Sequence, residues 1–179
     1  MTEVLSTVQV VMQGANYRTW EVSGSRIATV GFEDEATMGF VSAFDSPRQM
    51  VDGWREVEAT MLARYAPQFR EAGDKAWNVY SVFVTEARAS EEERREVRWI
   101  EEDLERTRKI TGTGVVTRDD VVKALLPLLP IMAKPLLAPE DSRQRLLRRI
   151  EVIAPGVRDV ALDDSINPKE VAALLRSEK

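Results

Sequence analysis

The sequence contains neither histidine nor cysteine. Their absence excludes thiol nucleophiles, Ser-His-Asp and Cys-His catalytic arrangements, and the His and Cys ligands of most zinc, haem and iron–sulfur sites. It also excludes disulfide bonds. An enzyme built on this chain would have to use carboxylates, Lys, Tyr, Ser or Thr, or a hard metal ion on oxygen ligands. The composition therefore favours a protein that is not an enzyme and that holds no cofactor.

The sequence also lacks a positive net charge, a long uninterrupted apolar run and a secretory signal. Its 30 acidic and 25 basic residues give a net charge of −5, so the charge balance does not support binding to nucleic acid. Two lysines and three prolines interrupt the longest apolar stretch, residues 121–137, which excludes a transmembrane helix there. The N-terminal residues show no basic segment followed by an apolar one. We therefore expect a soluble, cytoplasmic protein.

Residues 1–116 show the pattern of a domain that combines strands with helices. Short β-rich runs predict strands at residues 8–12, 20–22, 26–32, 38–44 and 77–85, and around Ile110. The turn residues Ser23-Gly24-Ser25 predict a hairpin between the second and third of these strands. The segments 38–44 and 77–85 are apolar on both faces, which is typical of central, covered strands.

Two helix starts are well marked in this domain. Ser46 is a suitable N-cap, with Pro47 at the first helical position and Gln49 completing a capping box. The helix that follows carries an apolar stripe at spacings of three and four, formed by Met50, Trp54, Val57, Met61, Tyr65 and Phe69. Ser90 and Glu93 form a second capping box, which opens a mostly polar helix that extends to about Glu105.

After residue 116 the pattern becomes helical. Thr117 with Asp120 opens an apolar helix, and further helices are expected at residues 140–153 and after Asn167. The sequence therefore predicts the class α+β. We expect a small, mostly antiparallel sheet packed against a long helix in residues 1–116, followed by a small C-terminal helical unit, residues 117–179, packed on that domain or appended to it.

Candidate catalytic and nucleotide sites are weak. The segment Gly112-Thr113-Gly114 lacks the third glycine of a dinucleotide fingerprint and is more typical of a plain turn. Glu33, Asp34 and Glu35 offer oxygen ligands for Mg²⁺, but adjacent residues on a turn point in different directions, so a solvated turn is favoured. A small Mg²⁺-dependent nuclease or phosphoesterase that uses carboxylates such as Glu33, Asp34 and Asp45 remains the alternative function.

Residues 91–109 are densely charged and have two interpretations. The simpler one is an exposed, salt-bridged helix. The sharper one is a helix that contacts another protein, because Trp and Arg are the residue types enriched in the cores of protein interfaces. Arginines on the expected helix 140–153 could instead contact phosphates, which leaves a DNA-binding accessory protein as a further alternative. The residues predicted to bind a partner are Arg94, Arg98, Trp99, Arg108, Lys109, Arg145 and Arg149.

Several short sequence segments occur in a characteristic order over residues 20–130. They are RIATVGFE at 26–33, MGFV at 38–41, WNVY at 77–80, IEED at 100–103 and TRKI at 107–110, with the Trp54 helix between the second and third. In this order, and in a chain of this size, they resemble the middle component of bacterial ABC-three-component antiphage defence systems, the group that includes Lamassu.

The resemblance implies a function without catalytic residues. Systems of this kind pair an SMC-like ABC ATPase with an effector, often a nuclease, and include a small middle protein. It implies that this chain is an accessory or scaffold subunit of an antiviral complex, bridging the ATPase and the effector. DNA would be contacted only indirectly, through the complex. It carries over no individual functional residue to this chain.

Overall fold

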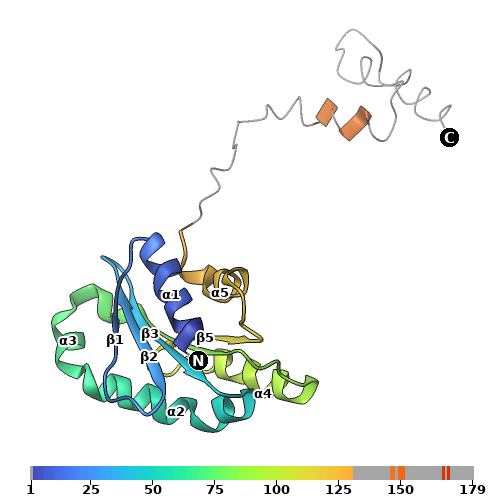
Figure 1. Ribbon diagram of the computed structural model, residues 1–179. Coiled ribbons are helices and arrows are strands. Elements are labelled where there is room, and N and C mark those ends of the chain that lie inside the picture. Colours follow the sequence, from blue (N-terminus) through green and yellow to red (C-terminus); the bar gives the residue numbers. More distant parts are fainter. Residues whose placement is uncertain (1, 131–145, 148, 152–166, 168, 170–179) are drawn as a thin grey trace. The chain divides into compact units, whose positions relative to one another are not determined.

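The structure, a computed structural model, describes residues 2–130, 146–147, 149–151, 167 and 169 (Figure 1). The chain divides into two compact units, Met1–Pro130 and Ile131–Lys179. The expected boundary after residue 116 is too early, because helix α5 (Arg118–Leu125) buries Val121 and Leu125 in the core of the first unit. The helices expected at 140–153 and after Asn167 lie mostly outside the described residues.

A five-stranded sheet forms the centre of the first unit. Its strands are β1 (Arg18–Glu21), β2 (Ala28–Glu33), β3 (Met38–Phe44), β4 (Val79–Thr85) and β5 (Arg108–Thr113), and they lie side by side in chain order. The pairs β1–β2 and β2–β3 are antiparallel, whereas β3–β4 and β4–β5 are parallel. The class α+β is confirmed in its general form, but the sheet is mixed rather than mostly antiparallel.

The parallel half of the sheet results from two helical crossovers, since parallel neighbours cannot be joined by a tight turn. Helix α2 (Pro47–Arg64) leads from β3 toward β4, followed by α3 (Ala66–Glu71) and the short 3₁₀ segment η1 (Gly73–Trp77). Helix α4 (Glu91–Glu102) leads from β4 to β5. The predicted long helix is present in part, because α2 ends at Arg64 and Phe69, the last residue of the expected apolar stripe, lies in α3. Helix α4 lies beside α2 on the same face of the sheet.

The chain begins with a helix, α1 (Thr2–Gly14), so the strand predicted at residues 8–12 is wrong. The short run of β-branched residues there masked a longer helical period. Val4, Val8, Val11 and Met12 recur at helical spacing, and all four are buried. Burial of this face against the sheet overrides the modest β preference of valine.

Helices cover both faces of the sheet and create separate cores. Helices α1 and α5, with the 3₁₀ turn η2 (Leu126–Leu128), lie on the face that carries Val30, Phe32, Val41 and Val82. Helices α2 and α4 pack on the other face; their core consists of Phe44, Met50, Trp54, Phe83, Val97 and Ile100. Every residue of β3 is buried, which confirms the prediction of a central, covered strand.

The predicted local signals are largely confirmed. Ser46 accepts a hydrogen bond from the backbone N–H of Gln49, although the Gln49 side chain accepts from the N–H of Asp45 rather than that of Ser46. The capping boxes that open α4 and α5 are complete. Gly24 in the β1–β2 turn has a φ of 70°, a conformation that favours glycine.

Candidate functional site

The outer face of α4 is a polar surface with one large aromatic residue. Val97 and Ile100 are buried against the sheet, whereas Trp99 is 66% exposed. Arg94 and Arg98, one helical turn apart, are also exposed. We call Arg94, Arg98 and Trp99 the α4 surface. The structure thus brings together three of the predicted partner-binding residues on one helix.

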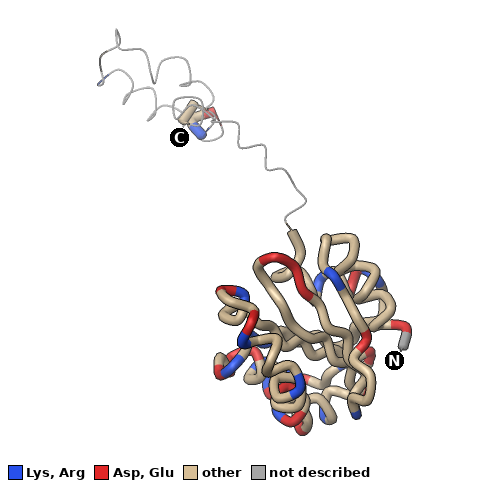
Figure 2. Tube along the Cα trace, turned by 90° about the vertical axis from the view of Figure 1, so that its left-hand side faces the viewer, with Lys and Arg blue, Asp and Glu red and all other residues tan. Residues whose placement is uncertain are grey.

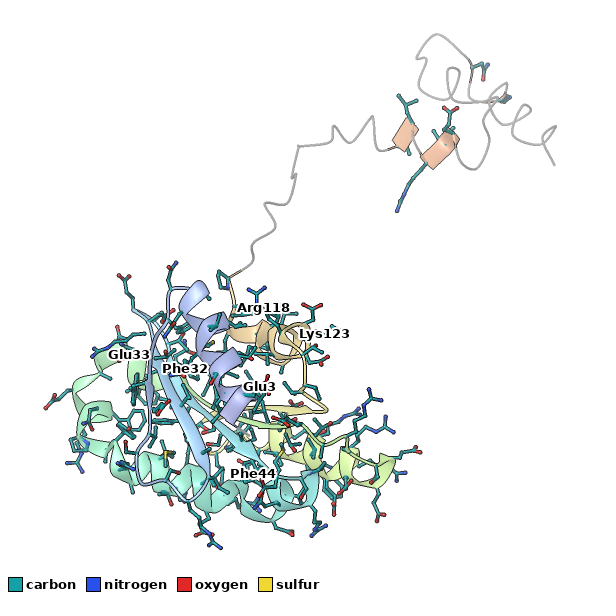
Figure 3. The ribbon with its side chains drawn as sticks, in the orientation of Figure 1. Glu3, Phe32, Glu33, Phe44, Arg118 and Lys123 are labelled. Carbon is teal, nitrogen blue, oxygen red and sulfur yellow. The ribbon has the colours of Figure 1, made fainter. Side chains whose placement is uncertain are left out.

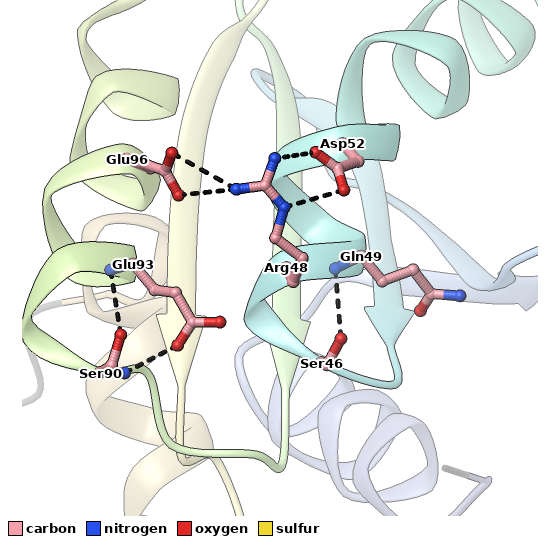
Figure 4. Close-up of polar contacts among 7 residues, drawn as sticks. All are labelled: Ser46, Arg48, Gln49, Asp52, Ser90, Glu93 and Glu96. Atoms are coloured by element: carbon pink, nitrogen blue, oxygen red, sulfur yellow. Dashed lines mark hydrogen bonds and ion pairs between the residues drawn. The ribbon is translucent and has the colours of Figure 1, made fainter.

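Polar contacts hold α4 in place against α2 (Figure 4). Ser90 and Glu93 close the capping box at its first turn. The Arg48 guanidinium of α2 donates hydrogen bonds to Asp52, with distances of 2.6 and 3.0 Å, and forms an ion pair with Glu96 of α4 at 3.2 Å. These two carboxylates, Asp52 first, raise the pKa of Arg48. The two helices are therefore linked by charge as well as by packing.

A buried ion cluster lies beneath these helices. The ammonium Nζ of Lys109 is 3.2 Å from Glu58 Oε1 and 2.9 Å from Asp103 Oδ1, and the Lys109 side chain is fully buried. It also donates to the carbonyl of Glu105 and lies 5.4 Å from the centre of the Trp54 ring. The cluster ties α2, the end of α4 and β5 together.

Hydroxyl groups complete the polar environment of this cluster. Thr107 Oγ1 is 2.5 Å from Glu58 Oε1, to which it donates, and 3.0 Å from Ser81 Oγ. Asp103, at the end of α4, also pairs with Arg55 of α2 at 3.3 Å. Because each of these charges has an opposite charge or a hydroxyl donor within hydrogen-bond distance, the cluster is a satisfied interior network rather than an open site.

Asp103 makes protein stability depend on pH. The hydrogen bond from Lys109 lowers the pKa of Asp103. A carboxylate whose pKa is lower in the folded than in the unfolded state stabilises the fold above its unfolded pKa of about 3.9, and this contribution is lost as the pH falls through the folded value. We expect Asp103→Asn to lower the unfolding free energy at pH 7 by about 2 kcal/mol.

Urea unfolding at pH 7 and pH 2.5 tests this expectation. The difference between the wild-type protein and Asp103→Asn should shrink markedly at the lower pH. The neighbouring exposed carboxylate offers a control, and Glu102→Gln should change stability little at either pH. A difference for Asp103→Asn that is the same at both pH values would contradict the ionic role of Asp103.

The remaining predicted partner residues do not join the α4 surface. Lys109 is buried in the ion cluster, which corrects its assignment as a surface contact. Arg108 precedes it in β5 and therefore points to the opposite face of the sheet. There its guanidinium donates to Asn78 Oδ1 and to Tyr80 Oη, both at 3.0 Å. The adjacent pair in the sequence is thus divided between an interior and a surface position.

Two predicted residues belong to the second unit. Arg145 lies outside the described residues, and Arg149 is exposed within that unit. Within the described part of the first unit, basic and acidic residues are interspersed (Figure 2). In this view the charged positions of the described residues do not form a continuous basic stripe of the kind that phosphate contacts favour.

The carboxylates of the alternative nuclease hypothesis do not converge. Glu33 ends β2, where it pairs with Arg18 and Lys75 at 3.6 and 3.5 Å. Asp34 accepts hydrogen bonds from the backbone N–H groups of its own turn. Asp45 follows β3, and the antiparallel pairing of β2 with β3 places it at the other end of the sheet from Glu33. Figure 3 shows this separation for Glu33 and Phe44, the residue before Asp45.

In the parts of the chain that the structure describes, no group of three or more Asp, Glu, His or Cys residues is placed to hold a metal ion. Among the described helices, none combines the length and apolar character needed to span a membrane.

The sequence contained a signal for the ion cluster that the sequence-based prediction missed. Glu58 follows Trp54 by four residues and precedes Met61 by three, so it interrupts the apolar stripe of α2. A carboxylate in such a stripe has to be buried with a partner. The identity of that partner, Lys109, could not be read from the sequence because 51 positions separate the two.

No protein-family model, curated protein or solved structure matches this chain.

Proposed function

We propose that the chain is a non-catalytic interaction subunit and that the α4 surface binds its partner. The exposure of Trp99 carries this proposal. An indole that is 66% exposed on an otherwise charged helix leaves a large apolar area in water. Trp and Arg are enriched among the residues that dominate protein–protein binding energy. Arg98 lies one position and Arg94 five positions before Trp99 on the same helix.

The rigidity of α4 supports the same proposal. Its first turn is closed by the capping box, its middle is paired with Arg48, and its end is fixed by the contacts of Asp103 with Arg55 and Lys109. A surface that is already ordered loses less conformational entropy when a partner binds. Helix α4 is therefore suited to act as a preformed binding surface.

The sequence resemblance supports the identity of the partners. We propose an SMC-like ABC ATPase and an effector protein, bridged by this subunit in an antiviral defence complex. Affinity purification of the tagged protein from its native host, followed by mass spectrometry, tests this identity. Recovery of both a large ABC-type ATPase and a second protein would support it, and a purified chain without partners would contradict it.

We expect Trp99→Ser to reduce recovery of the partner at least tenfold, since loss of a central aromatic contact typically costs about 2 kcal/mol or more of binding energy. The chain offers a matched control. Trp77 is 85% exposed in η1, away from α4 in the sequence, and Trp77→Ser should leave recovery unchanged. Quantitative mass spectrometry of the two purified variants measures the difference. Equal losses for both variants would contradict the assignment of the interface to α4.

A further inference from the structure

A cavity of about 200 Å³ lies between the segment that precedes β2 and helix α2. Its lining includes four apolar side chains, which are Ile27, Phe44, Val57 and Met61. Arg26, Asp52 and Glu56 also line it. The combination of apolar side chains with a few charged groups is characteristic of a binding site.

Gly53 supplies a second, independent observation. It lies in the interior of α2, where glycine is the least favourable residue apart from proline, and it lines the cavity. A Cβ added there would be 3.5 Å from Phe44, an ordinary contact, so packing does not require glycine. The missing side chain keeps this side of the cavity open, which fits the close approach of another group.

The charges that line the cavity indicate what could enter it. Asp52 is already hydrogen-bonded to Arg48. Arg26 and Glu56 are exposed and, within the described residues, form no ion pair. A complementary ligand would therefore place an acidic group near Arg26 and a basic group near Glu56, with an apolar group between them.

The size of the cavity limits the apolar group. A cavity of about 150 Å³ in a protein core can hold one benzene ring, whereas small-molecule and cofactor sites usually occupy about 300–1,000 Å³. The cavity is also linked to helix α4, because Arg48 binds both Asp52 in its lining and Glu96 of that helix. One large side chain of a protein that also covers α4 therefore fits the site better than a cofactor does.

We propose that this cavity anchors one large apolar side chain of the partner protein, flanked in that protein by one acidic and one basic residue. The inference rests on the proposed function, because it assigns the cavity to the same partner as the α4 surface. It adds a second contact region and the chemistry of the segment that binds there.

Methyl NMR spectroscopy of the full chain tests the site directly with three capped tripeptides, Lys-Leu-Glu, Glu-Leu-Lys and Gln-Leu-Gln. We expect saturable shifts of the Ile27 and Met61 methyl groups, with half-saturation at roughly millimolar concentration for so small a ligand. One charged peptide should bind at least threefold more tightly than Gln-Leu-Gln. The Met12 methyl group, in the core on the other face of the sheet, should not shift.

Variants connect the binding to the proposed residues. Gly53→Leu should abolish the shifts by filling the cavity, whereas Gly53→Ala adds a single methyl group and should retain them. Arg26→Gln and Glu56→Gln should each remove the preference for the charged peptide. Because both side chains are exposed, these variants keep the test valid if Gly53→Leu fails to fold.

The outcomes separate this inference from the proposed function. Absence of saturable shifts, undiminished binding to folded Gly53→Leu, or equal binding of all three peptides would overturn the anchor site. If that happens while recovery of the partner still depends on Trp99, the proposed function stands and only the anchor is wrong. Peptide binding with the expected preference, in a chain that recovers no partner from its host, would support the site and contradict the proposed function.

Gly53→Ala also has an expected effect on stability. Alanine is favoured over glycine in a helix interior and fits here without a close contact. We expect the melting temperature to rise by about 3 °C. The reverse substitution at an exposed position in the last turn of the same helix, Ala63→Gly, should lower it by less, because the penalty for glycine is largest in the helix interior. A melting temperature that falls in Gly53→Ala would mean that packing, rather than access to the cavity, requires the glycine.

Discussion

Replacement of Lys109 by methionine is expected to destabilise the protein by about 3–5 kcal/mol, the range found when one partner of a buried ion pair is removed. Glu58 is 4% exposed, and the Lys109 ammonium is the cation that pairs with it, at 3.2 Å. Without Lys109 the Glu58 carboxylate keeps, among its contacts with the described residues, only the hydrogen bond from Thr107. Its desolvation is then poorly compensated, and the unfolding free energy falls.

Removal of both charges should restore much of this stability. The double variant Lys109→Met/Glu58→Leu leaves no unpaired carboxylate in the core, and Asp103 keeps its contact with Arg55.

Urea unfolding of the single and double variants measures both effects. Arg18→Ala is a suitable control because it removes an exposed ion pair with Glu33, which should change stability by less than about 1 kcal/mol. A loss in Lys109→Met no larger than that in Arg18→Ala would mean that water reaches Glu58 and that the cluster is not sealed in solution.

Gly39→Ala is expected to lower the unfolding free energy by about 3 kcal/mol or more, at the upper end of the range for overpacked cores. A Cβ at this position would lie 2.2 Å from the backbone oxygen of Tyr80 in β4 and 2.7 Å from the ring of Phe32. The first atom belongs to the main chain of a paired strand, so it cannot move without disturbing the β3–β4 ladder.

The control for this substitution is Gly14→Ala at the end of α1, where an added Cβ meets no atom within 4 Å. Thermal and urea unfolding of the two variants should show a loss for Gly39→Ala and little change for Gly14→Ala. Similar stabilities would mean that the spacing of β3 and β4 in solution is wider than in this structure.

The sequence was sufficient for those features that depend on neighbouring residues. The helix starts at Ser46, Ser90 and Thr117 were predicted because a capping side chain and the N–H group that it binds lie within three positions. The β1–β2 hairpin followed from Ser23-Gly24-Ser25 for the same reason. The covered strand β3 followed from its apolar residues on both faces.

The sequence was not sufficient where distant segments compete or combine. Residues 8–12, predicted as a strand, are part of α1. Their valines recur at helical spacing, so a helix buries them against the sheet, and this burial outweighs their local preference. The direction of β4 relative to β3 was also missed, although the intervening helix α2 had been predicted. A helix of that length can lead to a strand that runs either antiparallel or parallel to β3. Packing of α2 on the sheet decides which of the two directions β4 takes.

For the candidate site, the sequence by itself determined the absence of His and Cys chemistry and the charged, Trp-containing helix α4. Only the tertiary structure decided that Trp99 faces solvent, that Lys109 is buried against Glu58, and that the cavity beside Gly53 exists. Exposure, ion pairing and cavities depend on which segments meet in space. Side-chain periodicity indicates which residues share one face of a helix or strand, but it does not indicate which other segment covers that face.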